Sequence, residues 1–139
     1  MSSVVSSTYP ITNLYDGNYN TFAHTLGAAF DGFVITLELT FPALVTHVKV
    51  VNRQDQCCQF RILGFDVYLK KTTGKEVVCG SITEERDVYE FQCFGVSAEV
   101  QVRTENSLSS YVNLGEVEVF GQGNYLSNRF MTMEIQSQT

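Results

Sequence analysis

Basic residues are scarce in this sequence. Nine Lys and Arg stand against fifteen Asp and Glu, and the formal net charge is -6 at pH 7. Proteins that hold nucleic acid or anionic membranes without sequence preference depend on clustered Lys and Arg. The composition therefore argues against a nucleic-acid partner and against attraction to anionic membrane surfaces.

Long apolar runs are also missing. No stretch approaches the roughly 20 consecutive apolar residues that a membrane-spanning helix needs. The opening residues 1–7 have neither a basic segment nor a long apolar one, so they do not resemble a secretory signal peptide. We therefore expect no membrane insertion and no targeting signal within these residues.

Known catalytic signatures are absent as well. The sequence has no nucleophile elbow, no phosphate-binding loop and no HExxH motif. Glycoside hydrolysis needs two carboxyl groups at a defined separation in space, which a sequence does not reveal. We therefore predict a protein that is not an enzyme.

Helical periodicity is sustained nowhere, whereas apolar and polar residues alternate along most of the chain. In residues 33–39 every second side chain is apolar, which is typical of a half-buried strand. With 139 residues, of which 44% are hydrophobic, the chain is large and apolar enough for one domain. We predict an all-β fold, an antiparallel sandwich or barrel, because turn signals separate further runs at 44–52, 64–70, 75–79, 88–94, 97–104 and 112–120.

The four cysteines are an even number that permits three pairings. No CxxC or Cys/His cluster indicates zinc. Cys57 and Cys58 are neighbours, and Cα atoms about 3.8 Å apart can be bridged only through a strained ring. A vicinal disulfide would form a small apolar plate suited to the carbon face of a sugar. Separate pairing of these two with Cys79 and Cys93, or four reduced thiols in a cytosolic protein, are the alternatives.

Two arginines flank the adjacent cysteines. Arg53 and Arg61 stand in a loop that follows an apolar strand, and such loops commonly carry binding sites. Guanidinium groups offer several donors and no acceptor, which suits sugar hydroxyls and ring oxygens. Asp55 could orient one arginine through a charge-assisted pair. The alternative is a solvated charged loop, which would not need two cysteines at its centre.

Together these residues resemble the fucose-binding F-type lectins. That family shows a His, a long gap and then Arg-x-Asp-Cys-Cys-x-x-Arg, and this chain has, in the same order, His24, Arg53, Asp55, Cys57, Cys58 and Arg61. The resemblance runs from about residue 6 to residue 121. It implies an antiparallel β-sandwich of the jelly-roll, discoidin-like (galactose-binding-like) kind, and a carbohydrate-binding lectin for terminal L-fucose.

The resemblance also implies roles for these residues. His24, Arg53 and Arg61 would hydrogen-bond the sugar, while a Cys57–Cys58 disulfide would stack on its apolar face. Cys79–Cys93 would match a further family disulfide that joins two neighbouring strands. The expected partners are fucosylated glycans or glycoproteins outside the cell, bound by a secreted protein. Because one such site is weak, several would act together, in an oligomer or a multidomain precursor.

The chain departs from the family pattern in two respects. One additional residue separates Asp55 from Cys57, and a small bulge could absorb it. Two further family cysteines are absent, and Phe22 and Gly115 stand at their positions. An adhesion or protein-interaction module with an altered sugar pocket is the alternative function, because fold alone does not decide between the two.

An oxygen-rich turn, residues 13–18, is similar to the calcium loop of the related lectins. Calcium takes six to eight oxygen ligands, although turns of this composition also occur without a metal. The related lectins add a Glu from the final strand. The resemblance therefore implies a structural Ca²⁺ held by Asn13, Asp16, Asn18, Thr21, Gly115 and Glu116.

The tail is the last feature of the sequence. The sandwich pattern ends at residue 121, yet Met131, Met133 and Ile135 alternate with polar residues and predict one more strand. We therefore divide the chain into a lectin domain over 1–121 and an extension over 122–139. The extension would replace the family's missing opening strand, as in a circular permutation, or begin another copy. A flexible tail is the third alternative.

Overall fold

The computed structural model describes residues 6, 8–25, 32–105, 112–121, 124–125 and 128–135, with side chains described up to residue 121. Within these residues the chain is built from strands and two 3-10 turns, and none of its helical segments is long and apolar enough to cross a membrane. The elements are η1 (Ile11–Tyr15), β1 (Ala23–His24), β2 (Phe33–Val51), η2 (Gln59–Ile62), β3 (Asp66–Lys71), β4 (Glu76–Ser81), β5 (Val88–Thr104), β6 (Asn113–Leu114), β7 (Glu116–Gly121), β8 (Asn124–Tyr125) and β9 (Asn128–Ile135). The predicted all-β class is confirmed.

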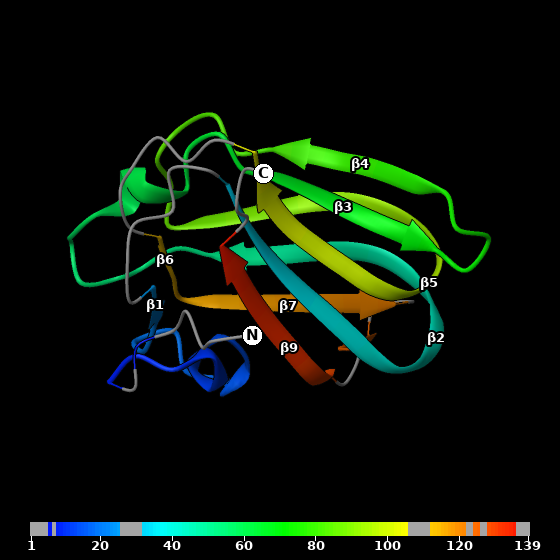
Figure 1. Cartoon of the computed structure of the whole chain (residues 1–139), viewed down its shortest axis with the longest axis horizontal. Coiled ribbons are helices and arrows are strands. Elements are labelled where there is room, and N and C mark those ends of the chain that lie inside the picture. The colour runs from blue at the N-terminus through cyan, green and yellow to red at the C-terminus, as the bar shows by residue number, and fades with distance from the viewer. Residues whose placement is uncertain are drawn as a thin grey trace.

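Two long strands, β2 and β5, form the frame of the sandwich. They pair antiparallel from Phe33 opposite Thr104 to Val51 opposite Val88. The register breaks between Glu38 and Ala43, where both strands curve at the right-hand end of Figure 1. Each strand therefore contributes to both layers. The runs predicted at 33–39 and 44–52 are two halves of one bent strand, because residues 40–43 between them stay in the strand while the pairing register shifts.

The remaining strands complete the two layers on either side of this frame. The first half of β2 pairs with β9, and its second half pairs with β7. Strand β3 pairs with the second half of β5, and β4 lies beyond β3 at the edge. The short strands β1 and β6 form a separate two-stranded sheet at the left-hand end of Figure 1. Every pairing is antiparallel, as the sequence predicted.

The core lies between the layers. Phe33, Ile35 and Leu37 of β2 are completely buried, and Phe65 packs edge-on against Phe33 with ring centroids 6.1 Å apart. Each such side chain contributes roughly 2 kcal/mol by leaving water. The predicted alternation is therefore visible in the strand, because these apolar side chains face the core and Glu38 on the other face is exposed.

The Cys79–Cys93 disulfide connects β4 to β5. The family resemblance implied that this pair joins neighbouring strands, and that detail is wrong: β3 lies between β4 and β5 in the sheet. Cys93 belongs to the half of β5 that pairs with the second half of β2. The bridge therefore ties the edge of one layer to the other layer.

The tail contains the predicted strand. Strand β9 pairs with β2 from Phe33 opposite Ile135 to Leu39 opposite Asn128, and Figure 1 shows it lying along the first half of β2. Residues 122–123, 126–127 and 136–139 lie outside the described residues. The division at residue 121, and the choice between a permuted domain and the start of another copy, stay predictions.

Candidate functional site

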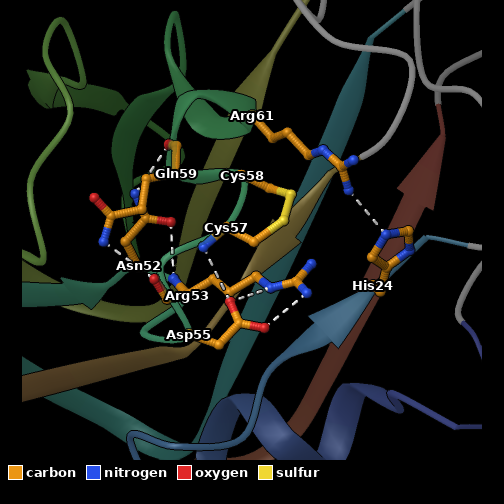
Figure 2. Close-up of a disulfide and its surroundings, with 8 residues drawn as sticks. All are labelled: His24, Asn52, Arg53, Asp55, Cys57, Cys58, Gln59 and Arg61. Atoms are coloured by element: carbon orange, nitrogen blue, oxygen red, sulfur yellow. Dashed lines mark hydrogen bonds and ion pairs between the residues drawn. A yellow bond between two sulfur atoms is a disulfide. The ribbon is translucent and has the colours of Figure 1, made fainter.

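The predicted site residues gather at the end of the sandwich opposite the bends of β2 and β5. Strand β2 ends at Val51, and the disulfide loop (residues 52–58) follows it and leads into η2. Strand β1 brings His24 to the same end, where its ring contacts Arg61 of η2 (Figure 2). Segments far apart in the sequence therefore meet beside the adjacent cysteines.

Cys57 and Cys58 are disulfide-bonded to each other, with Cα atoms 3.7 Å apart. The loop around them uses two residues in the left-handed region, Gln56 at φ 63° and Cys58 at φ 66°. L-residues pay about 1–2 kcal/mol each for this conformation. The additional residue between Asp55 and Cys57 lies in this loop, outside any strand ladder, where Gln56 adopts a left-handed conformation.

Asn52 holds the disulfide loop in place. Its side chain is completely buried and donates from Nδ2 to the carbonyls of Gln59 at 3.0 Å and Arg86 at 3.3 Å. Its Oδ1 accepts from the backbone N–H of Arg53 at 2.8 Å. Both ends of the loop are thus fastened to one side chain, as Figure 2 shows for the contacts with Gln59 and Arg53. Sequence reasoning missed Asn52, whose only signal is its position directly after an apolar strand.

His24 and Arg61 form the centre of the site. Arg61 Nη1 lies 3.0 Å from His24 Nε2, and His24 Nδ1 lies 2.6 Å from the carbonyl oxygen of Thr25. A carbonyl can only accept, so Nδ1 carries the proton and Nε2 accepts from the guanidinium. The backbone of His24 is fixed as well, since its N–H donates to the carbonyl of Tyr9 at 3.1 Å. The imidazole is therefore held in one tautomer and one orientation.

Arg53 lies on the other side of the disulfide from Arg61 in Figure 2. It forms a two-pronged pair with Asp55, with Nε to Oδ1 at 2.7 Å and Nη2 to Oδ2 at 2.8 Å. This hydrogen bonding by Arg53 lowers the pKa of Asp55 below its usual value. The guanidinium carbon is also 3.9 Å from the centroid of the Phe22 ring. Asp55 therefore orients an arginine, as the charge pattern predicted, and Nη1 takes no part in that pair.

Phe22 and Gly115 stand at the positions of the two family cysteines that this chain lacks. Phe22 stacks on Tyr9 with ring centroids 4.5 Å apart and contacts Arg53. A Cβ added at Gly115 would meet the carbonyl oxygens of Asn52 at 2.7 Å and Val51 at 3.0 Å, so no side chain fits there without a backbone shift. Position 22 is therefore held by an aromatic stack, and position 115 lies against the backbone at the end of β2. Tyr9 is a second residue that sequence reasoning missed.

The oxygen-rich turn lies against Glu116 of β7. This carboxyl is 1% exposed, and Oε2 accepts from the N–H of Gly17 at 2.9 Å. Oε1 has no hydrogen-bond partner within the described part of the chain. Burial, followed by the charge of Asp16, raises the pKa of Glu116 to about 8. A buried carboxyl with a second carboxyl beside it and one unused oxygen suits a cation.

The other predicted calcium ligands are brought together only in part. Asp16 accepts from the N–H of Asn18 at 2.9 Å and from the hydroxyl of Thr21 at 2.6 Å. Asn13 instead donates through Nδ2 to the carbonyl of Phe22 at 2.9 Å. Gly115 donates its N–H to Val51 at 2.9 Å. The described residues hold no cluster of three or more His, Cys, Asp and Glu side chains, so neutral oxygens would have to complete the set.

The profile described as the NedA-like, galactose-binding domain matches residues 13–103. The chain is similar to the lectin domain of lectinolysin complexed with Lewis B antigen, with 26% identity, a TM-score of 0.71, and 86% of this chain and 88% of that chain covered. A Streptococcus pneumoniae fucose-binding module gives 26% identity, a TM-score of 0.70 and 86% coverage of each chain.

A more distant structure shares the fold alone. It is the family 32 carbohydrate-binding module of Clostridium perfringens NanJ in complex with galactose, with 18% identity, a TM-score of 0.65, and 84% of this chain and 88% of that chain covered. No curated protein matches significantly. Because the matching profile spans His24, the disulfide loop and most of both layers, the chain belongs to the NedA-like, galactose-binding domain family and has the β-sandwich fold of lectins and carbohydrate-binding modules.

Proposed function

We propose that this chain is a lectin that binds terminal L-fucose on glycans at the site formed by His24, Arg53, Arg61 and the vicinal disulfide. The observation that carries the proposal is the 3.0 Å contact between Arg61 and His24, residues 37 positions apart, beside the bonded Cys57 and Cys58. A charged donor, an imidazole acceptor and a small apolar plate lie together, which is what one face of a sugar ring requires.

The contacts would work as follows. A sugar hydroxyl would replace the direct contact between Arg61 and His24, accepting from the guanidinium and donating to Nε2, so both protein groups would keep a partner. Arg53, held by Asp55 and Phe22, would supply a second fixed set of donors. Each charge-assisted hydrogen bond is worth on the order of 1.5–3 kcal/mol. The disulfide would contact the apolar carbons of the ring.

The comparisons support fucose as the sugar. Two solved structures at 26% identity are a fucose-binding module and a lectin domain in complex with Lewis B antigen. The galactose-bound structure at 18% identity supports the fold alone, so galactose is the natural competitor in a test.

Titration calorimetry with methyl α-L-fucoside and methyl β-D-galactoside tests the proposal. We expect fucoside binding that His24→Ala and Arg61→Lys each weaken at least about 10-fold, because a fixed fork is not replaced by an ammonium group. Arg103→Lys is the matched control, since Arg103 is a partly exposed arginine on β5, away from the site. Tighter binding of galactoside, or equal losses in the control, would refute the assignment. A glycan array without any signal would favour the protein-interaction alternative.

We also propose that Asp16 and Glu116 hold a structural Ca²⁺ with oxygens of Asn18, Thr21 and the neighbouring backbone. The support is the buried Glu116, whose Oε1 is unused and whose pKa is raised by burial and by Asp16. The ion would neutralise this pair of carboxylates and tie the oxygen-rich turn to the final strand. Gly115 would act through its backbone carbonyl because it has no side chain, and Asn13 would act through Oδ1 or its carbonyl, since its bond to Phe22 uses only Nδ2.

The setting we propose is extracellular. Two disulfides within 139 residues favour an oxidising compartment. We propose a binding protein without catalytic activity, in which several copies or domains act together on a fucosylated surface.

A further inference from the structure

A hollow of about 320 Å³ lies against the vicinal disulfide, and His24, Arg53 and Arg61 are not among the residues that line it. Its volume is at the lower end of the roughly 300–1,000 Å³ typical of small-ligand sites. Figure 2 shows Gln59, one of its lining residues, on the side of the disulfide away from Arg61 and His24. The lining residues are Gln54, Gln56, Cys57, Cys58, Gln59, Glu85 and Asp87.

The walls of this hollow are held together by hydrogen bonds between two separate segments. Asp87, which precedes β5, accepts from Gln59 Nε2 on its Oδ1 at 2.7 Å. Its carbonyl accepts from the N–H of Asn52 at 2.9 Å and from Gln54 Nε2 at 3.2 Å. Residues 33 and 28 positions apart are thereby fixed against each other. Because these segments are already fixed before a ligand binds, less conformational entropy is lost on binding than in a loose loop.

The same bonds decide which chemical groups face the hollow. Gln54 donates from Nε2 to Asn52 and Asp87 backbone carbonyls, and Gln59 donates from Nε2 to the Arg53 carbonyl and to Asp87. An amide nitrogen has two hydrogens, so both amides have used their donors and offer only Oε1. The lining also holds two carboxyl groups and no Lys or Arg. Apart from the amide of Gln56, the side chains that line the hollow therefore offer mainly acceptors.

We propose that this hollow is a second sugar subsite, which binds the neutral sugar next to fucose through hydroxyls that donate to Glu85, Asp87, Gln54 and Gln59. The inference rests on the proposed fucose site. The disulfide would be shared, with fucose on the side of His24 and Arg61 and the second sugar on the side of Gln59. Hydroxyl groups are the donors that neutral sugars have in abundance. A sulfated or sialylated neighbour would bring an anion toward two carboxylates and would be excluded.

The test compares three ligands by titration calorimetry on the full chain: methyl α-L-fucoside, a neutral fucosyl-galactose disaccharide, and the same disaccharide with a sulfated galactose. We expect the neutral disaccharide to bind about 5- to 10-fold more tightly than the fucoside, as one or two exposed charge-assisted hydrogen bonds would allow. Glu85→Ala should remove most of that gain and leave fucoside affinity unchanged. The sulfated disaccharide should bind more weakly than the neutral one, and Glu85→Gln should narrow that difference.

Glu38→Gln is the control, because Glu38 is an exposed carboxyl of β2 near the bend and outside the hollow. Fucoside binding without a gain for the disaccharide, or the same loss in the control as in Glu85→Ala, would overturn the subsite and leave the fucose site standing. Tighter binding of a fucosyl-glucosamine with a free amine than of the neutral disaccharide would overturn the assignment to a neutral sugar. Failure of every ligand to bind would overturn both proposals.

Discussion

The disulfide loop and the oxygen-rich turn lie at the same end of the sandwich, and each is fastened to the end of a strand. In the disulfide loop the fastening side chain, Asn52, is completely buried and uses its donors and its acceptor within the protein. In the oxygen-rich turn the corresponding side chain, Glu116, is equally buried and leaves Oε1 unused. The buried side chain of the first region is therefore satisfied within the protein, whereas that of the second keeps one oxygen for the proposed Ca²⁺.

The largest loss of stability should follow from removing the Asn52 side chain. Asn52→Ala leaves the carbonyls of Gln59 and Arg86 and the N–H of Arg53 without their partner, which should cost about 3 kcal/mol of unfolding free energy. Urea unfolding measures it. The exposed Asn20→Ala is the control and should change stability by less than about 0.5 kcal/mol. Equal stabilities of the two variants would show that the loop is held by other contacts.

Calcium should stabilise the protein through Glu116 beside the oxygen-rich turn. At a calcium concentration about 100 times the dissociation constant, the free energy of unfolding should rise by about 2.7 kcal/mol. Glu116→Gln should abolish this response. Without calcium this variant should be at least as stable as the parent, because no buried carboxyl then lies beside Asp16. Differential scanning calorimetry with calcium or EDTA measures both. A full calcium response in Glu116→Gln would exclude Glu116 as a ligand.

A smaller effect should separate binding from stability within the disulfide loop. Asp55→Asn releases the fork of Arg53 and should weaken fucoside binding about 3- to 10-fold. Stability should change little, because the Asp55 side chain is 48% exposed and exposed ion pairs contribute at most about 1 kcal/mol. Glu76→Gln, which releases Arg103 from a comparable 2.7 Å pair, is the matched control and should leave binding unchanged. Unchanged affinity in Asp55→Asn would remove Arg53 orientation from the binding mechanism.

The smallest effect should come from a contact beside the oxygen-rich turn. The Tyr19 hydroxyl donates to Glu118 Oε1 at 2.5 Å, so Tyr19→Phe should cost about 1 kcal/mol in the free energy of unfolding. The hydroxyl of Tyr68 lies 3.4 Å from Asp66, and Tyr68→Phe should cost less. Thermal unfolding of both variants gives the comparison. A larger loss in Tyr68→Phe would contradict the view that Tyr19 anchors the turn to β7.

Much of the fold was predictable, because the alternation of apolar and polar residues over short stretches identifies strands. The alternation in residues 33–39 identified a half-buried strand, and Phe33, Ile35 and Leu37 are indeed in the core. The bend of β2 near Ala43 was not predictable, because whether a strand ends or curves depends on the partner strand that follows it. The Cys79–Cys93 pair was predicted correctly, but the adjacency of its two strands was not, because sheet order also depends on partners distant in the sequence.

The residues of the candidate site were predictable, whereas the hydrogen bonds that hold them in place were not. His24, the two arginines and the cysteine pair stand out by type and order, and the structure brings His24 and Arg61 into contact. The network around Asn52 and Asp87 gave no signal beyond the position of Asn52 after an apolar strand, since its partners are mostly backbone carbonyls of distant segments. Amides and carbonyls have the same chemistry everywhere in a chain, so only their meeting in space selects them.

By itself the sequence determined the all-β class, the arginines that flank the adjacent cysteines, and the scarcity of basic residues. These features depend only on residue type and short spacing along the chain. Only the tertiary structure decided that β2 belongs to two layers and that the disulfide loop is clamped to the segment before β5. It also decided that a hollow lined with acceptors lies behind the cysteine pair. Such features arise from contacts between residues tens of positions apart, and the free energy of those contacts exists only once the chain is folded.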